Sequence, residues 1–181
     1  MSAVEIRPSC LRDASYVFAN LRPLDCHEAF CQIDHRVKTH EVAWWSIQIG
    51  ESWVAYLKGR PVMVFGYMPM NVAAVSIWAM GTKHATRVVP AVTRHVVLDV
   101  IPSLIERGYH SMEARSIVEH EQAPRWMEST GAVRSGEPFP YGRDGELFQL
   151  FRWTRPSYER IRRRYTDTTP TERDQRTKQR R

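Results

Sequence analysis

The sequence has few cysteines and lacks a long apolar run. Its three cysteines, Cys10, Cys26 and Cys31, do not have the Cys-x-x-Cys spacing of structural zinc sites. No secretory signal precedes them, so we expect reduced thiols in a cytosol. The longest apolar stretch, residues 88–98, is interrupted by proline, threonine, arginine and histidine. It falls far short of the ~20 apolar residues of a membrane span, and none is expected.

Metal-binding motifs are missing as well, and most of the chain has no excess of charge. The seven histidines do not form a set such as His-Glu-x-x-His, so no metal is expected. The net charge is +6, but residues 155–181 hold ten Lys or Arg against four Asp or Glu, while the preceding residues hold 16 of each. The basic character therefore belongs to the end of the chain.

The length and composition indicate one globular domain followed by a tail. Hydrophobic residues make up 43% of the chain and charged residues 25%, which is ordinary for a packed protein. We predict a domain over residues 1–154 and a basic tail over 155–181, helical over 157–165 at most and disordered beyond about residue 165. Truncation after Trp153 is then expected to leave thermal stability almost unchanged. Candidate residues for contact with DNA or a protein partner are Arg160, Arg162, Arg163 and Arg164, against the alternative of a merely solubilising terminus.

Hydrophobic periodicity predicts an alternating α/β order within the domain. A short strand over residues 3–7 precedes two short helices within 10–33. A hairpin over 53–57 and 62–66 and an apolar strand over 72–80 follow. Then come a helix over 92–105, divided or kinked at Pro102, a strand over 109–118, a helix over 123–130 and a last strand over 147–153. Residues 34–51 fit helix, loop or a partner-binding insertion.

This order resembles the Gcn5-related N-acetyltransferase (GNAT) fold, a mixed, mainly antiparallel sheet flanked by helices. In that family a Q/R-x-x-G-x-G/A loop at a helix start holds the pyrophosphate of acetyl-CoA. Here Arg87, Val88, Val89, Ala91 and Val92 take its positions, but Pro90 and Val92 replace the small residues. Residues 119–133 resemble the family's N-x-x-A-x-x-F/Y-x-x-x-G-F segment, with His120 at the Asn position. The resemblance implies an acetyl-CoA site that is at best degenerate.

A narrower resemblance covers residues 125–133 and 141–151. Their R-W-M-x-x-x-G-A and D-G-x-x-F-x-x-F patterns look like small acetyltransferase-like proteins of short-tailed bacteriophages, some of which are internal virion or virion-morphogenesis proteins. This likeness implies virion or assembly proteins as partners and a place in the host cytoplasm or the virion. Taken alone, the Asp144-Gly145 pair is a hairpin turn signal.

Acetyl transfer needs a group that takes a proton from the acceptor amine. Candidates are Glu113 on the strand after the long helix and His120 at the next helix start, whereas Tyr141 is a candidate proton donor to the leaving thiolate. The two candidate bases also have a structural interpretation: Glu113 as a half-buried strand residue that faces solvent, and His120 as a polar residue that begins a helix. Trp44 and Trp45 are expected in the core, or else on a partner surface.

Two functions are compatible with these features. The first is a virion-associated or virion-assembly protein that keeps the GNAT fold with a degenerate acetyl-CoA site. The alternative is an active N-acetyltransferase that moves an acetyl group from acetyl-CoA to an amine of a protein or small molecule. Loss of the small residues at Pro90 and Val92 favours the first.

Overall fold

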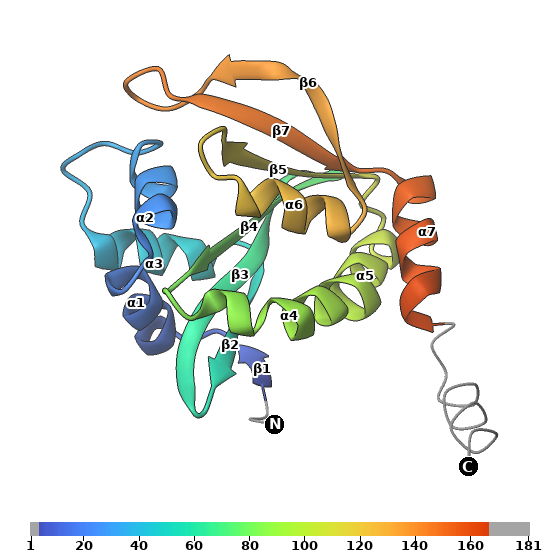
Figure 1. The fold of residues 1–181 in the computed structure, drawn as a ribbon, viewed down its shortest axis with the longest axis horizontal. Coiled ribbons are helices and arrows are strands. Elements are labelled where there is room, and N and C mark those ends of the chain that lie inside the picture. Colours follow the sequence, from blue (N-terminus) through green and yellow to red (C-terminus); the bar gives the residue numbers. More distant parts are fainter. Residues whose placement is uncertain (1–3, 167–181) are drawn as a thin grey trace, which may run out of the picture.

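The computed structural model describes residues 4–166. A seven-stranded sheet runs through the molecule in the order β1-β2-β3-β4-β5-β7-β6 (Figure 1). Neighbouring strands are antiparallel except β4 and β5, which are parallel. The mixed, mainly antiparallel sheet predicted from the sequence is thus confirmed. The strands are β1 Val4–Pro8, β2 Glu51–Leu57, β3 Arg60–Asn71, β4 Ala74–Gly81, β5 Ser111–Ile117, β6 Ala132–Pro140 and β7 Leu147–Trp153.

Helices cover both faces of this sheet, so the strands are buried on two sides. In β2 and β3, Val54 and Val64 join one apolar core, whereas their neighbours Ala55 and Phe65 join another. This alternation follows from the two-residue period of a strand. Helices α1 Leu11–Ala19, α2 Pro23–Phe30 and α3 Thr39–Gln48 cover one face. The other is covered by α4 Val89–His95, α5 Ile101–Glu106, α6 Gln122–Ser129 and α7 Arg155–Thr166 (Figure 1).

The long helix of the sequence prediction is divided, as expected near Pro102. A π-helical segment, Val96–Val100, separates α4 from α5, and Pro102 lies in the first turn of α5. Proline has no backbone N–H to close an intrahelical bond, and a π-turn accommodates such a break without ending the helix.

Two segments were left open or were predicted differently from the sequence. Of the alternatives for residues 34–51, the structure has a helix, α3, which fully buries Ala43 but leaves Trp44 46% and Trp45 44% exposed. The two tryptophans are therefore not in the core, and a partner surface stays a prediction. Residues 132–140, for which no strand was predicted, form strand β6 at the edge of the sheet. Edge strands tolerate proline because half of their N–H groups face away from the ladder, which accounts for Pro138 and Pro140 there.

Helix α7 packs on the domain and extends it beyond the predicted boundary at residue 154. Tyr158 and Ile161 are buried in the main core, and the Tyr158 hydroxyl donates a hydrogen bond to the Val97 carbonyl at 3.1 Å. The helical extension expected over 157–165 is therefore present, and it is part of the domain. The disorder predicted beyond residue 165 falls mostly outside the described residues.

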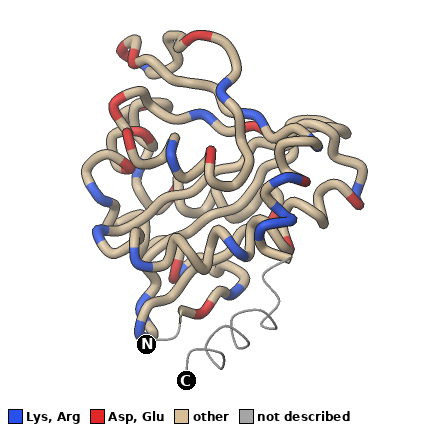
Figure 2. The backbone as a smooth tube through the Cα atoms, turned by 45° about the vertical axis from the view of Figure 1, so that its right-hand side comes forward, with Lys and Arg blue, Asp and Glu red and all other residues tan. Residues whose placement is uncertain are grey.

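Charges of both signs are interspersed along the backbone of the domain (Figure 2). This distribution agrees with the equal numbers of acidic and basic residues that precede residue 155. Among residues 4–166, no helix has the length and apolar character to span a membrane.

Candidate functional site

Strands β4 and β5 separate partway along their length. They pair in parallel only from Ala74 to Ser76 on β4 and from Ser111 to Glu113 on β5. Beyond this point β4 continues to Gly81 and β5 to Ile117, but the two strands no longer pair with each other. Unpaired strand edges inside a domain need other hydrogen-bond partners, so side chains, solvent or a ligand must fill the gap.

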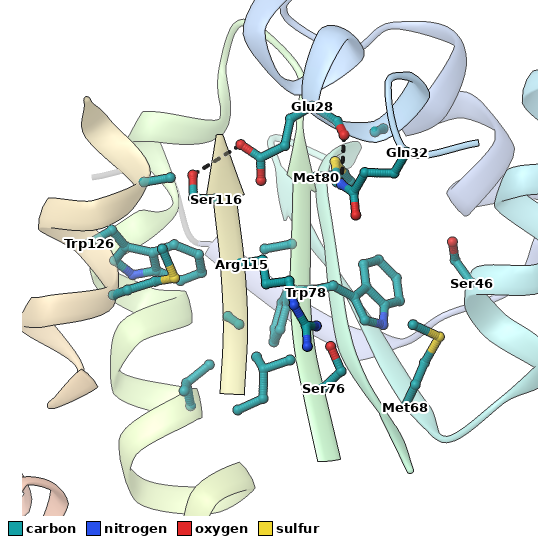
Figure 3. Close-up of a pocket in the computed structure, with 18 of the residues that line it drawn as sticks. Glu28, Gln32, Ser46, Met68, Ser76, Trp78, Met80, Arg115, Ser116 and Trp126 are labelled. Atoms are coloured by element: carbon teal, nitrogen blue, oxygen red, sulfur yellow. Dashed lines mark hydrogen bonds between the residues drawn. The ribbon is translucent and has the colours of Figure 1, made fainter. Parts of the chain in front are cut away.

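A cavity of about 270 Å³ occupies this gap (Figure 3). On the α4–α6 side its wall is apolar and includes Phe65, Ala114 and Trp126. On the α1–α3 side Trp78 and Met80 combine with polar groups from α2, α3 and the two strands. Those polar residues are Glu28, Gln32, Ser46, Ser76 and Arg115, whereas Ser116 lies on the Trp126 side of β5 (Figure 3). The cavity therefore connects the two faces of the sheet.

Glu28 extends from α2 into the gap. Its Oε2 accepts hydrogen bonds from the Ser116 hydroxyl at 3.0 Å and from the Ile117 backbone N–H at 3.3 Å. The side chain thereby supplies the partner that β4 no longer offers to the edge of β5. Burial raises the pKa of Glu28 to about 7, although His120 and the two hydrogen bonds act in the opposite direction. A carboxyl group that titrates near neutrality is suited to accept a proton in catalysis.

A second cavity of about 280 Å³ adjoins the first. Both are lined by Glu28, Ala79, Ala123 and Trp126, so the two cavities share a wall. The second cavity extends toward the starts of α4 and α6, where Val89 and His120 line it. The sequence prediction placed these two residues in a cofactor loop and a catalytic position, and the fold brings them to the same cavity.

A buried polar cluster closes one wall of the second cavity. Arg22 pairs with Asp25 and lies 3.3 Å from Nε2 of His120, which is 3.6 Å from Asp25 Oδ2. His120 Nδ1 accepts a hydrogen bond from the Ala123 backbone N–H at 3.3 Å. Burial acts to raise the pKa of Asp25, but contacts with His120 and Arg22 outweigh it and hold that pKa below the ordinary value. Both His120 nitrogens are thus committed to structure.

The predicted phosphate loop keeps only part of its donor set. The backbone N–H groups of Arg87 and Val88 are used in the short 3₁₀ turn Ala85–Arg87, and the Val92 N–H bonds to the Val88 carbonyl. Pro90 has no N–H, so Val89 and Ala91 remain as first-turn donors of α4. The Arg87 side chain is exposed.

The side chains of that loop also lie differently from expectation. Val88 and Val92 are fully buried in the core. The bulk that Val92 adds at this position of the family loop therefore packs into the core. Gly81 lies where a Cβ would come within 2.4 Å of Ala85, so the end of β4 and the following turn pack closely.

The three predicted catalytic residues occupy different environments. Glu113 is 7% exposed rather than facing solvent, and its carboxylate bonds to Arg115 at 2.5 Å and lies 3.7 Å from Arg152. It lines neither cavity described above. Tyr141 lines the first cavity, with the Arg115 guanidinium 5.0 Å from its ring centre. Tyr141 thus lines the first cavity, His120 lines the second, and Glu113 lines neither.

Sequence reasoning missed Glu28, Arg115 and Ser116. The signal that was available for Glu28 is its place with Asp25, three residues apart, on the side of α2 that also buries Ala29. Two acidic residues on a buried helix face require partners, and they mark a polar site within the fold. The interpretation of residues 24–33 as a simple amphipathic helix overlooked this pair.

No protein-family model matches the chain, and no curated protein is similar to it in sequence. Several solved acetyltransferases are similar in structure. A ribosomal-protein-alanine N-acetyltransferase from Brucella melitensis superposes with a TM-score of 0.61 at 19% identity, over 82% of this chain and 97% of that one. YncA from Salmonella typhimurium, classed as an acetyltransferase and solved with its cofactor acetyl-CoA, gives 0.61 at 17% identity over 83% and 91%.

A third similar structure is a chimera of the Vibrio cholerae spermidine N-acetyltransferase SpeG with hSSAT. It gives a TM-score of 0.62 at 11% identity over 87% of this chain and 98% of the chimera. At these identities the likeness establishes the fold. The chain has the GNAT fold, a mixed sheet with one parallel strand pair at its centre.

Proposed function

We propose that this protein is an N-acetyltransferase that uses the gap between β4 and β5 to bring acetyl-CoA and an amine together. The observation that carries this proposal is the position of Glu28. Its carboxylate lies at the junction of the two cavities, against the edge of β5, with a pKa of about 7. A proton acceptor at the meeting point of two spaces is what transfer between two substrates requires.

The second cavity and the α4–α6 half of the first fit acetyl-CoA. Their walls supply apolar surface from Ala79, Ala123 and Trp126, and Arg22 and Arg125 border the outer end near the start of α4. Cations and first-turn N–H groups are suitable partners for a pyrophosphate. Acetyl-CoA bound there would supply an activated acetyl group. Its transfer forms a carbon–nitrogen bond to the amine and breaks the carbon–sulfur bond of the thioester. The electron pair of the broken bond stays on sulfur, and the amine releases a proton.

Glu28 accepts that proton, directly or through one water. Ser116 and the Ile117 N–H fix Oε2, which leaves Oε1 for the amine side. Tyr141 lines the same cavity and is the residue assigned to return a proton to the thiolate. Glu113 and His120 act as positioning residues, since their polar atoms already have protein partners.

The test is thiol release from acetyl-CoA in the presence of a mixture of amines. We expect wild-type turnover that Glu28→Gln lowers, whereas Glu137→Gln, the same chemical change on the exposed edge strand β6, leaves it unaltered. Equal rates for Glu28→Gln and wild type would reject the role of Glu28.

A role in phage particle assembly is a second proposal, based on the resemblance of residues 125–151. The exposed Trp44 and Trp45 on α3 offer an apolar contact surface for such a partner. Pull-down of virion proteins by wild type but not by a Trp44→Ser, Trp45→Ser double variant would support this role. Equal recovery by both proteins would remove the tryptophan surface from it.

A further inference from the structure

Arg115 brings a positive charge to the acceptor half of the first cavity. Its side chain lines the cavity on the α1–α3 side, opposite the half assigned to acetyl-CoA. In Figure 3 its guanidinium points toward Ser76 and Trp78, whereas Trp126 lies across β5. A cation inside a largely apolar cavity has a large desolvation cost unless anionic or polar partners surround it.

The partners that the protein supplies leave one donor of Arg115 unused. Its guanidinium pairs with Glu113 at 2.5 Å and lies 5.0 Å from the Tyr141 ring centre. The second cation beside Glu113, Arg152, is 3.7 Å away and half exposed to solvent. The Nε of Arg115 is buried and has no hydrogen-bond partner among residues 4–166, so this N–H is available to a ligand.

A second unused donor lies in the same half of the cavity. Trp78 Nε1 is buried and also lacks a hydrogen-bond partner within the described part of the chain. Around it the wall is apolar, built from Phe18, Val42, Met68 and Met80. Unsatisfied buried donors are uncommon in native structures, and a ligand that accepts hydrogen bonds is one way to satisfy them.

The geometry points to an acceptor that carries a carboxylate as well as the reacting amine, namely an apolar amino acid or a compound of that type. Its carboxylate pairs with Arg115, its apolar side chain lies against Trp78 and Met80, and its amine lies toward Glu28. The position of the amine rests on the proposed function, whereas the carboxylate site does not. A polyamine fits poorly, because its ammonium groups only donate hydrogen bonds, and the unused groups of Arg115 and Trp78 are donors as well.

The carboxylate site is tested without acetyl-CoA. Calorimetric titration compares N-acetyl-L-methionine with its carboxamide, and N-acetyl-L-phenylalanine with its carboxamide, so that each pair differs only in the anionic group. We expect each acid to bind about 10- to 100-fold more tightly than its amide, as for a hydrogen-bonded ion pair with a buried cation. Equal affinities, or binding of neither compound, would overturn the proposal.

A variant pair locates the effect. Arg115→Gln is expected to remove the preference for the acid and leave binding of the amide as in wild type. Arg152→Gln removes the other cation beside Glu113, but this residue does not line the cavity, so the preference should persist. Loss of the preference in Arg152→Gln alone would place the carboxylate elsewhere. The comparison of acid with amide in wild type stands even if a variant fails to fold.

The same titration with acetyl-CoA separates this inference from the proposed function. Acid-selective binding without acetyl-CoA binding would keep the carboxylate site and reject acetyl transfer. Acetyl-CoA binding without acid selectivity would keep the transferase and reject the amino-acid acceptor.

Discussion

The Glu28 carboxylate on α2 accepts a hydrogen bond at 3.0 Å from the Ser116 hydroxyl on β5. This bond joins a helix on one face of the sheet to the strand edge where β4 and β5 separate. It fixes a titratable group at the point where the two cavities meet. The catalytic predictions depend on this placement.

The first prediction concerns the pH dependence of acetyl transfer. Because burial raises the pKa of Glu28 to about 7, the carboxylate form needed to accept a proton appears only as pH rises through that value. We predict that kcat/KM of wild type rises toward a plateau above about pH 7 and that Glu28→Gln lowers the plateau about 100-fold and abolishes the rise. Steady-state rates at constant ionic strength check this. A rise that persists in Glu28→Gln would assign the titration to another group.

The second prediction concerns stability at the same residue. Folded Glu28 keeps its proton up to about pH 7, whereas a glutamate in the unfolded chain loses it near 4.5, so the folded state binds more protons between these values. The contribution of Glu28 to the free energy of unfolding therefore falls as pH rises across this window and then levels off. Glu28→Gln, which does not ionise, should gain up to about 3 kcal/mol relative to wild type between about pH 4 and about pH 8.

Urea unfolding of both proteins at those two pH values measures the difference. Glu137→Gln provides the matched control and should show no such change. A difference between Glu28→Gln and wild type that is the same at both pH values would contradict a raised pKa in the folded protein.

The third prediction concerns helix α7. Tyr158 is 2% exposed in the main core and donates to the Val97 carbonyl, so Tyr158→Ala should lower the free energy of unfolding by about 3–5 kcal/mol and Tyr158→Phe by about 1 kcal/mol. Arg160→Ala on the exposed side should change it by less than about 0.5 kcal/mol.

Truncation after Trp153 is now expected to destabilise the domain, contrary to the expectation from sequence. Urea unfolding curves check all four proteins, and an unchanged truncated protein would show that α7 contributes no packing.

The fourth prediction concerns nucleic acid. Arg160, Arg162 and Arg163 are exposed on α7, whereas Tyr158 and Ile161 of the same helix are buried. If the helix binds DNA phosphates, replacing all three arginines with glutamine should weaken DNA retention and flatten its dependence on salt, with stability preserved. Electrophoretic mobility shifts at increasing salt measure this. Retention that is equal for variant and wild type at every salt concentration would remove α7 as a DNA-binding element.

Sequence patterns predicted the order of most elements because apolar periodicity depends on neighbouring residues. They also located the turn at Asp144-Gly145 and the division near Pro102. They failed for β6, whose prolines and glycine suggest a loop and whose pairing with β7 alone makes it a strand. They failed for the end of the domain as well, because the strongly basic composition of α7 hides the apolar stripe of Tyr158, Ile161 and Tyr165.

The site was harder to predict, because it is assembled from segments far apart in the chain. Glu28 and Ser116 are 88 residues apart, and no local pattern joins them. His120 and Val89 were predicted from family motifs and do line one cavity, but the contacts of His120 with Asp25 and Arg22 depend on tertiary packing. Charge balance around Arg115 likewise becomes visible only once β5 and β7 are paired.

Calorimetric titration with acetyl-CoA tests the central claim most directly. Wild type should bind it saturably, and Ala79→Phe should weaken binding more than about 10-fold, because Ala79 lines both cavities and a phenyl ring there would take up space in them. The variant should unfold within about 2 kcal/mol of wild type, since the ring enters an existing cavity. Absence of heat at millimolar acetyl-CoA, or equal affinity of the two proteins, would contradict an acetyl-CoA site between β4 and β5.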